Sequence, residues 1–428
     1  MPPRLDKIAL RGFFLATVFF QATGASTFRL DIPDGLSDSA RTTSLQAFLN
    51  RSEDTLVLPP RPGGYVTGPL HIRRSGLTLL MMPGTELRAA AGAFPTSKDC
   101  LLKIKSTKNV AVIGYGARLV MRKQEYTSGE WRHAISIRGA HHVRIEGLTI
   151  DSSGGDGIYV DGAHGERTFS ENIVIRNCHI RGHRRQGISV ISAENLLVEN
   201  CRIEGTAGTS HESGIDFEPD HADQKLVNCR VRNCVFSGNR QYAAAAYLAK
   251  LNSASYPISI GFENCLFVKS DSGSGVGFWG FDKKPVGGAI SLQRCSFRGK
   301  SGPLFSVRDW KPGAAAVSLR DCDSVSSPDS TIRMAGFGPL PPPLLQSFAS
   351  IPGGCEITLG NWAIDSLSHR IARGQWIPSP WGAKVRLQAG DTLRAVSRRK
   401  GLVSDTMVWE APRYLRKGFG GLIPNPGR

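Results

Sequence analysis

Long apolar runs are absent after the first 25 residues, so no later stretch approaches the length of a membrane-spanning segment. Charge is also sparse. Only 21% of the 428 residues are charged and 40% are hydrophobic, a composition that argues against a mostly disordered chain. The 48 glycines follow no Gly-x-y period, which excludes collagen and indicates the many turns of an all-β protein.

Acidic residues are outnumbered, with 36 Asp and Glu against 53 Lys and Arg, and the net charge is +17. This excess favours an anionic partner, and nucleic acid, an anionic polysaccharide and a membrane surface all fit it. Charge alone does not separate these three partners.

Residues 1–25 have the pattern of a secretory signal, with basic residues, an apolar run over 13–20, and small residues after it. An uncleaved anchor and a buried N-terminal helix are the alternatives. Cleavage would remove three basic residues and Asp6, leaving a net charge of +15. We therefore expect a secreted or periplasmic protein without stable membrane insertion. Export also weakens the case for nucleic acid as the partner.

An internal repeat is the most informative pattern. Short β-rich runs alternate with period two and end on a cysteine, at spacings of 23 to 33 residues. No unit contains an amphipathic helix, which argues against a leucine-rich repeat. The chain is thus expected to form roughly nine stacked coils. The repeated cysteines are Cys178, Cys201, Cys234, Cys265, Cys295 and Cys322.

The residue before four of these cysteines is asparagine, which tolerates the left-handed α conformation and suits a tight bend. A second strand then follows in each coil, and it begins at a glycine. Stacked parallel strands with bends between them form a solenoid, whose crossovers should be right-handed. The bend asparagines are Asn177, Asn200, Asn233 and Asn264, and the second strands are 157–162, 187–192, 214–219 and 275–280.

These features resemble the right-handed parallel β-helix of the pectate-lyase-like superfamily. Residues 44–49 resemble its amphipathic cap helix, and residues 54–73 its first coil. The resemblance implies an all-β single-stranded solenoid over 27–325, after the signal peptide expected at 1–25. Residues 326–428 are expected to form an irregular C-terminal β extension that caps the open end, either as final irregular coils or as a small β appendage, and a sugar-binding module is the alternative. The resemblance does not define a reaction, because one fold hosts many activities.

The cysteine repeat has two interpretations. Disulfides would suit an oxidising compartment, but small inward-facing residues stacked in the core fit in-register parallel strands better. Cys100, Cys229 and Cys355 lie outside the repeat, and the sequence does not decide whether they pair.

Side-chain alternation places Asp216 and Glu218 on one exposed strand face, about 7 Å apart. Asp161 should lie two coils away, at roughly 10 Å. Glycoside hydrolysis uses carboxylates at such separations, so Asp216 and Glu218 are the leading catalytic pair, with Asp161 or Asp156 assisting. A solvated acidic face and a Ca²⁺ site are the alternatives. No cofactor is certain from the sequence.

Basic and aromatic residues accompany these carboxylates. The loops before two of the strands are rich in Arg and His, which could bind an anionic sugar, whereas solvated turns are the alternative. Two outward aromatic residues could stack on sugar rings or pack under a loop. The candidate substrate-binding residues are His183, Arg184, Arg185, Gln186, Tyr159, His211 and Trp279.

Polygalacturonases within the superfamily carry Asn-Thr-Asp-Gly, Asp-Asp and Gly-His-Gly segments on successive coils. Asp156 with its flanking glycines resembles the first segment, but the other two are missing, so that catalytic assignment does not transfer. Pectate lyases use acidic residues for Ca²⁺ and an Arg or Lys as base, a part that Arg184 or Arg185 could take. The pairing of residues 184–192 with 214–219 also resembles secreted right-handed β-helix repeat proteins.

The leading hypothesis is an exported, polysaccharide-degrading enzyme that acts on an anionic glycan through a glycoside hydrolase-type carboxylate pair. The first alternative is a polysaccharide lyase of the same fold, and the second is a non-catalytic solenoid that binds a glycan or the cell envelope. The sequence leaves the sugar, the linkage, the metal requirement and the oligomeric state open.

Overall fold

The computed structural model describes residues 26–325, except 164, 271–272, 282–284 and 300–302. It also describes residue 375 and short strands between 331 and 410. The expected signal segment, residues 1–25, lies outside the described residues. Within the described part, no helix is both long enough and apolar enough to cross a membrane.

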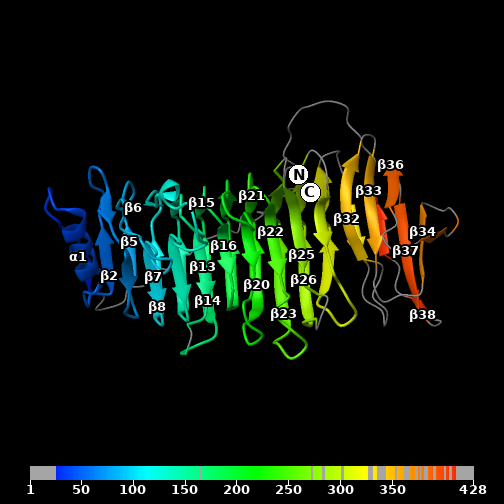
Figure 1. Cartoon of the computed structure of the whole chain (residues 1–428), viewed down its shortest axis with the longest axis horizontal. Coiled ribbons are helices and arrows are strands. Elements are labelled where there is room, and N and C mark those ends of the chain that lie inside the picture. The colour runs from blue at the N-terminus through cyan, green and yellow to red at the C-terminus, as the bar shows by residue number, and fades with distance from the viewer. Residues whose placement is uncertain are drawn as a thin grey trace, which may run out of the picture.

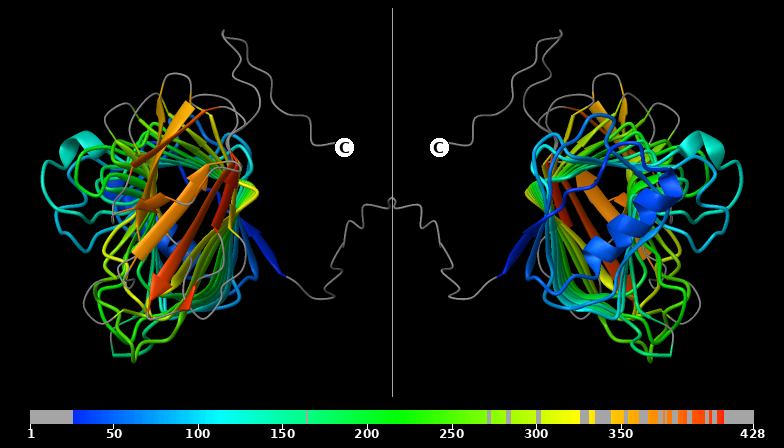
Figure 2. Two further views of the ribbon diagram at one scale, coloured as in Figure 1. Left: turned by 90° about the vertical axis from the view of Figure 1, so that its right-hand side faces the viewer. Right: turned by 90° about the vertical axis from the view of Figure 1, so that its left-hand side faces the viewer.

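Helix α1 (Asp38–Leu49) lies across the N-terminal end of the molecule (Figure 2, right). It buries Leu45, Phe48 and Leu49 and so covers the hydrophobic core at that end. The helix starts six residues before the expected residue 44. Its start is set by Ser37, whose side chain accepts a hydrogen bond from the backbone N–H of Ala40 at 3.2 Å.

The rest of the chain to residue 325 is a parallel β-solenoid in which each turn adds one strand to each of three sheets (Figure 1). The expected all-β right-handed parallel β-helix is therefore confirmed. One sheet has ten strands, one more than the roughly nine coils expected. These strands are β3 (Tyr65–Thr67), β6 (Glu86–Ala89), β9 (Arg118–Val120), β12 (Thr149–Asp151), β15 (His179–Arg181), β18 (Arg202–Glu204), β21 (Val235–Ser237), β24 (Leu266–Val268), β27 (Ser296–Arg298) and β30 (Asp323–Val325).

The sheet that precedes it in each turn contains the first β-rich run of every repeat. Its eleven strands are β1 (Thr27–Arg29), β2 (Thr55–Leu58), β5 (Thr78–Met81), β8 (Lys108–Ile113), β11 (His141–Glu146), β14 (Ser170–Arg176), β17 (Ala193–Glu199), β20 (Leu226–Arg232), β23 (Ile258–Glu263), β26 (Gly288–Gln293) and β29 (Ala316–Arg320).

The third sheet carries the candidate site. Its parallel strands are β4 (Leu70–Ile72), β7 (Leu102–Lys105), β10 (Ile135–Arg138), β13 (Ile158–Asp161), β16 (Gln186–Val190), β19 (Ser213–Phe217), β22 (Tyr242–Tyr247), β25 (Ser274–Trp279) and β28 (Pro303–Val307). A short 3₁₀ helix, η1 (Lys123–Glu125), precedes β10.

Antiparallel strands extend this third sheet beyond β28, and others form a further six-stranded sheet at the C-terminal end of the molecule (Figure 1). The extension consists of β32 (Leu344–Ile351), β33 (Gly354–Gly360) and β36 (Lys384–Gln388). The further sheet consists of β31 (Thr331–Met334), β34 (Ser366–Ile371), β35 (Ile377–Ser379), β37 (Thr392–Arg399), β38 (Leu402–Val403) and β39 (Met407–Glu410).

The asparagine bends are confirmed. Asn177, Asn200, Asn233 and Asn264 have φ angles between 52° and 56°. Their side chains also bond between coils, since the Nδ2 of Asn200 donates to the Oδ1 of Asn177 at 3.3 Å. The bend is thus stabilised by local conformation and by the coil below it.

Cysteines line the core rather than crosslink it. Eight of the nine, all within 26–325, are buried with free thiols, which agrees with the core interpretation. Cys100 and Cys229 are among these free thiols, and the side chain of Cys355 lies outside the described residues. Strand hydrogen bonds and apolar packing therefore join these coils, and these eight cysteines form no disulfide.

Candidate active site

A carboxylate-rich cluster lies on the outer face of the third sheet. Asp216 pairs in register with Ser189 on one side and Ala245 on the other, and Tyr159 follows one strand further on. The register confirms the expected column and the two-coil separation of β13 from β19. The expectation that this strand face is exposed is wrong for Asp216, Ser189 and Tyr159, because neighbouring side chains bury all three. Strand β22 was missed, because its Ala-rich sequence lacks the initial glycine and the alternation of its neighbours.

Asp216 is buried, with 0% of its side chain exposed, and a neighbouring amide holds it. The Nε2 of Gln186 donates to its Oδ2 at 2.8 Å, and the backbone N–H of Ser213 donates to the Oε1 of Gln186 at 2.9 Å. The Oδ1 of Asp216 has no hydrogen-bond partner within the part of the chain that the structure describes. Gln186 thus positions Asp216 and does not reach solvent itself.

His211 lies over both carboxylates. Its Nδ1 is 3.7 Å from the Oδ2 of Asp216 and 3.9 Å from the Oε1 of Glu218. The pKa of His211 is raised, chiefly by its contact with Asp216. One third of the side chain is exposed, and the ring stands edge-on to Trp279 with centroids 5.4 Å apart. His211 is therefore a partly exposed imidazole whose protonated form is favoured by the buried carboxylate beside it.

Glu218 is the more accessible carboxylate, with 17% of its side chain exposed. Its Oε2 accepts from the Nη2 of Arg185 at 2.6 Å. The pKa of Glu218 is nevertheless raised, first by burial and then by the negative charge of Asp216. A carboxylate of this kind can face a substrate and respond to charge that develops there.

Arg185 joins Glu218 to two further carboxyl groups. Its Nε lies 3.2 Å from the Oε2 of Glu130, and its Nη1 lies 3.9 Å from the Oδ2 of Asp156. Only 11% of the Arg185 side chain is exposed. With Asp216, four carboxyl groups lie around one guanidinium and one imidazole. Arg185 is thus occupied by the protein's own acids.

Asp156 lies beneath Arg185 and is fully buried. The backbone N–H of Gln186 donates to its Oδ1 at 3.1 Å. Burial raises the pKa of Asp156 to about 8. The backbone N–H of Asp156 donates to the Nδ1 of His133 at 3.1 Å, and burial lowers the pKa of that imidazole well below its usual range. Asp156 therefore supports the cluster from below.

Other expected residues lie apart from this cluster. Asp161 accepts hydrogen bonds from Tyr159 at 3.0 Å and from Gln224 at 3.1 Å, and both it and Tyr159 are buried. His183 is fully buried and bonds to Ser153, with its pKa lowered to about 3 by burial. The structure therefore corrects the expectation that His183 and Tyr159 face a substrate.

Arg184 and Trp279 are also less available to a substrate than expected, since Arg184 binds a neighbouring loop and Trp279 is buried. The guanidinium of Arg184 donates to the backbone carbonyls of Tyr126 at 2.6 Å and Thr127 at 2.8 Å, which ties it to a neighbouring loop. Trp279 lies one strand beyond Tyr247, and the two rings are 5.9 Å apart. The structure thus adds Tyr247 to the aromatic wall beside His211.

The sequence did not identify Glu130 and His133 as site residues. Both precede β10, and Glu130 reaches Arg185 through a long-range contact. A Cβ at Gly155 would lie 2.5 Å from the carbonyl oxygens of Glu130 and Trp131, so this glycine permits the close approach of their loop. The glycine beside Asp156 was the only local signal of that approach.

A cation site is a second use of the same side chains. His211, Asp216 and Glu218 offer one ligand atom each, all within 4.8 Å of one another. Calcium takes six to eight oxygen ligands, whereas this set supplies two carboxylates and a nitrogen. Arg185 and Gln186 already occupy one oxygen on each carboxylate. The donor set therefore does not fit the Ca²⁺ alternative.

Comparison with known proteins agrees with this architecture. Residues 123–297 match the family model described as a right handed beta helix region. An uncharacterized protein of Bacillus subtilis (strain 168), YclG, is 30% identical over 181 residues, which is 36% of this chain and 31% of YclG. The chain thus spans about a third of the length of that curated relative.

Solved structures that resemble the chain include the A-module of the Azotobacter vinelandii mannuronan C-5 epimerase AlgE4. The identity is 16%, the TM-score is 0.45, and the match covers 68% of this chain and 76% of that one. An iota-carrageenase is 15% identical with a TM-score of 0.38, covering 62% and 56%. The Erwinia carotovora polygalacturonase is 15% identical with a TM-score of 0.38, covering 70% and 96%.

Such distant likenesses carry no information about a reaction. The family match and the observed parallel solenoid agree with each other and confirm the resemblance in fold. The chain therefore contains a right-handed parallel β-helix, of which residues 123–297 match the family model.

Proposed function

We propose that the protein hydrolyses glycosidic bonds of an anionic polysaccharide at the cluster of His211, Asp216, Glu218 and Arg185. The observation that carries the proposal is the position of His211 Nδ1 between two carboxylates, at 3.7 Å and 3.9 Å, on an outward sheet face. A proton carrier beside an accessible carboxylate is the minimum that glycoside hydrolysis needs.

Each side chain has a role that follows from its surroundings. Asp216, 3.7 Å from Nδ1 of His211, favours a proton on that nitrogen, and Nε2 is the nitrogen that protonates the leaving glycosidic oxygen. Glu218 faces the anomeric carbon and stabilises the positive charge that develops as the carbon–oxygen bond breaks. Water then adds to that carbon, and its proton returns to His211. The step therefore balances without a cofactor.

Hydrolysis fits the charge of the cluster better than β-elimination does. A lyase develops negative charge on an enolate and needs a cation beside it. Here four carboxyl groups lie around Arg185 and His211. Arg185 is bound to Glu218 and close to Glu130 and Asp156, and His211 lies near Asp216 and Glu218, so neither cation is left free for an enolate. A carboxylate-rich centre instead favours the oxocarbenium-like transition state of a hydrolase.

Export belongs to the same proposal and is supported by the signal-like residues 1–25. Incubation of the purified protein with a panel of acidic and neutral polysaccharides tests the activity. We expect new reducing ends without ultraviolet-absorbing unsaturated ends. Unsaturated ends would favour the lyase alternative, and absence of any product would favour a glycan-binding solenoid.

A further inference from the structure

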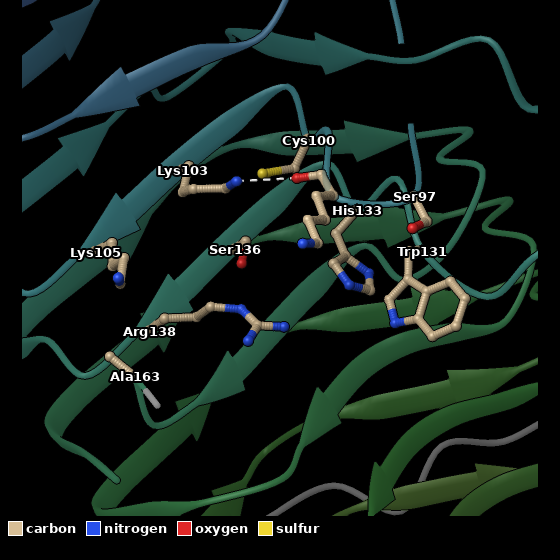
Figure 3. Close-up of a pocket in the computed structure, with 10 residues that line it drawn as sticks. Ser97, Cys100, Lys103, Lys105, Trp131, His133, Ser136, Arg138 and Ala163 are labelled. Carbon is tan, nitrogen blue, oxygen red and sulfur yellow. Dashed lines mark hydrogen bonds between the residues drawn. The ribbon is translucent and has the colours of Figure 1, made fainter. Parts of the chain in front are cut away.

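A cavity of about 440 Å³ opens on the same sheet (Figure 3). The strand order places it on the N-terminal side of the cluster. Strands β7 and β10 form its floor, and the loops before them form its wall. The labelled side chains of Lys103, Ser136 and Arg138 rise from neighbouring strands over one face of the sheet. This cavity is separate from the cluster and has no part in the bond-breaking steps described above.

The lining of the cavity is strongly basic. None of its ten lining residues is a carboxylate, and four are cationic, namely Lys98, Lys103, Lys105 and Arg138. Lys105 pairs with Glu166 at 3.0 Å and Arg138 with Asp161 at 3.4 Å, whereas Lys98 and Lys103 form no ion pair within the described residues. Among the described residues, the one hydrogen bond of the Lys103 Nζ goes to the backbone carbonyl of Lys98, at 2.9 Å. Two cations are thus available for an anion from outside.

The register places the cavity along the solenoid axis from the cluster. Lys103, Ser136, Tyr159, Ser189 and Asp216 pair on five successive strands. Four strand spacings separate Lys103 from Asp216 by about 19 Å. A chain-like ligand of several sugars that lies along the axis would therefore reach both places at once.

The two places are also joined by side chains. His133 lines the cavity and accepts a hydrogen bond from the backbone of Asp156, below Arg185. Trp131 lies at the cavity with 44% of its surface exposed, and the preceding residue, Glu130, contacts Arg185. An exposed indole next to cationic groups suits a sugar ring that carries an anionic substituent.

We propose that this cavity is an anion subsite that binds a carboxylate or sulfate group of an acidic glycan, several sugars away from the bond cleaved at Glu218. The location of that bond rests on the proposed function, whereas the anion binding does not. Lys98 and Lys103 supply the charge, Arg138 completes the basic wall, and Trp131 packs against the sugar.

Binding measurements on the full-length protein test the subsite apart from cleavage. Calorimetry would compare a uronic-acid oligosaccharide, a sulfated oligosaccharide and a neutral one of equal length. The test variant is Lys98→Ala/Lys103→Ala. Its matched control is Lys250→Ala/Lys311→Ala, which removes two exposed lysines that do not line the cavity.

We expect the test variant to bind at least one acidic oligosaccharide about tenfold more weakly or worse than wild type, and the control to bind normally, because hydrogen bonds to charged groups are strong. Neutral-sugar binding should not change. If the variant loses more affinity for the uronic-acid oligosaccharide, the bound substituent is a carboxylate. If it loses more affinity for the sulfated oligosaccharide, the substituent is a sulfate. Equal binding by the test variant and wild type in both acidic arms would overturn the subsite, even if the protein proves to be a hydrolase. Lysine-dependent binding without cleavage would support the subsite and overturn the proposed function.

Discussion

The Nδ1 of His211 lies 3.7 Å from the Oδ2 of Asp216, and Asp216 itself is fully buried. This relationship gives the two residues unequal roles. Asp216 cannot reach a substrate, but it can orient the imidazole and stabilise its charge. Glu218, held by Arg185 at 2.6 Å, is left as the carboxylate that faces outward.

The first prediction concerns the pH dependence of activity. Because Asp216 raises the pKa of His211, and the proton donor acts in its protonated form, Asp216→Asn should move the alkaline limb of the pH–rate profile to lower pH. The maximal cleavage rate of Asp216→Asn should also be lower than that of wild type, by about 10²-fold or more. NMR titration of His211 gives the same pKa without substrate. An unchanged His211 pKa in Asp216→Asn would contradict the assigned role.

A second prediction concerns stability and the buried Asp156. Its folded-state pKa of about 8 lies above its ordinary value of 3.8, so the folded protein holds this proton more tightly. The resulting stabilisation is complete below pH 3.8 and is lost as the pH rises towards 8. Between these limits, the unfolding free energy of wild type should fall relative to that of Asp156→Asn by about 1 kcal/mol per pH unit.

Denaturant unfolding across that pH range checks this difference. The exposed Asp223 provides the control, since Asp223→Asn should follow wild type at every pH. Parallel curves for Asp156→Asn and wild type would refute the account of Asp156.

The sequence predicted the solenoid well because its signals are local and repeated. Asparagine before Cys201 or Cys234 predicts a bend, and two-residue alternation placed Asp216 and Glu218 on one outward face. Burial could not be predicted in the same way. Whether Asp216 or Glu218 reaches solvent depends on His211 and on the coils to either side.

Contacts between distant loops were also beyond the sequence. Glu130 contacts Arg185 because the loop before β10 folds against Gly155. The spacing of residues in the sequence does not predict this contact. His183 looked like part of a basic, solvent-facing turn, but the same turn buries its imidazole against Ser153. The sequence did not predict Tyr247 as a site residue, because its strand β22 was not predicted. The alanines of that strand give no alternation of apolar and polar residues.

A third prediction concerns the asparagine bends. Asn200→Ala should lower the unfolding free energy by about 1–2 kcal/mol, because alanine disfavours a φ of 53° and cannot bond to Asn177. Asn200→Gly should cost less, since glycine adopts this φ freely. Chemical denaturation measures both. If the glycine variant were the less stable of the two, the backbone argument would be wrong.

Metal removal supplies a fourth prediction. Arg185 and Gln186 occupy one oxygen of Glu218 and of Asp216, so the cluster needs no Ca²⁺ to balance its charge. Dialysis against EDTA should therefore leave both the activity and the melting temperature unchanged. Loss of activity that added Ca²⁺ restores would instead support the calcium alternative.

Glu218→Gln tests the central claim most directly. Glutamine preserves the size of the side chain and its contact with Arg185 but removes the charge that faces the anomeric carbon. Reducing-end release from the best substrate of the panel should fall by about 10²- to 10⁴-fold, while oligosaccharide binding stays near that of wild type. The matched control is Glu263→Gln on β23, which removes an exposed carboxylate paired with Arg294 and should cleave normally. Cleavage by Glu218→Gln at the wild-type rate would contradict the proposed reaction centre.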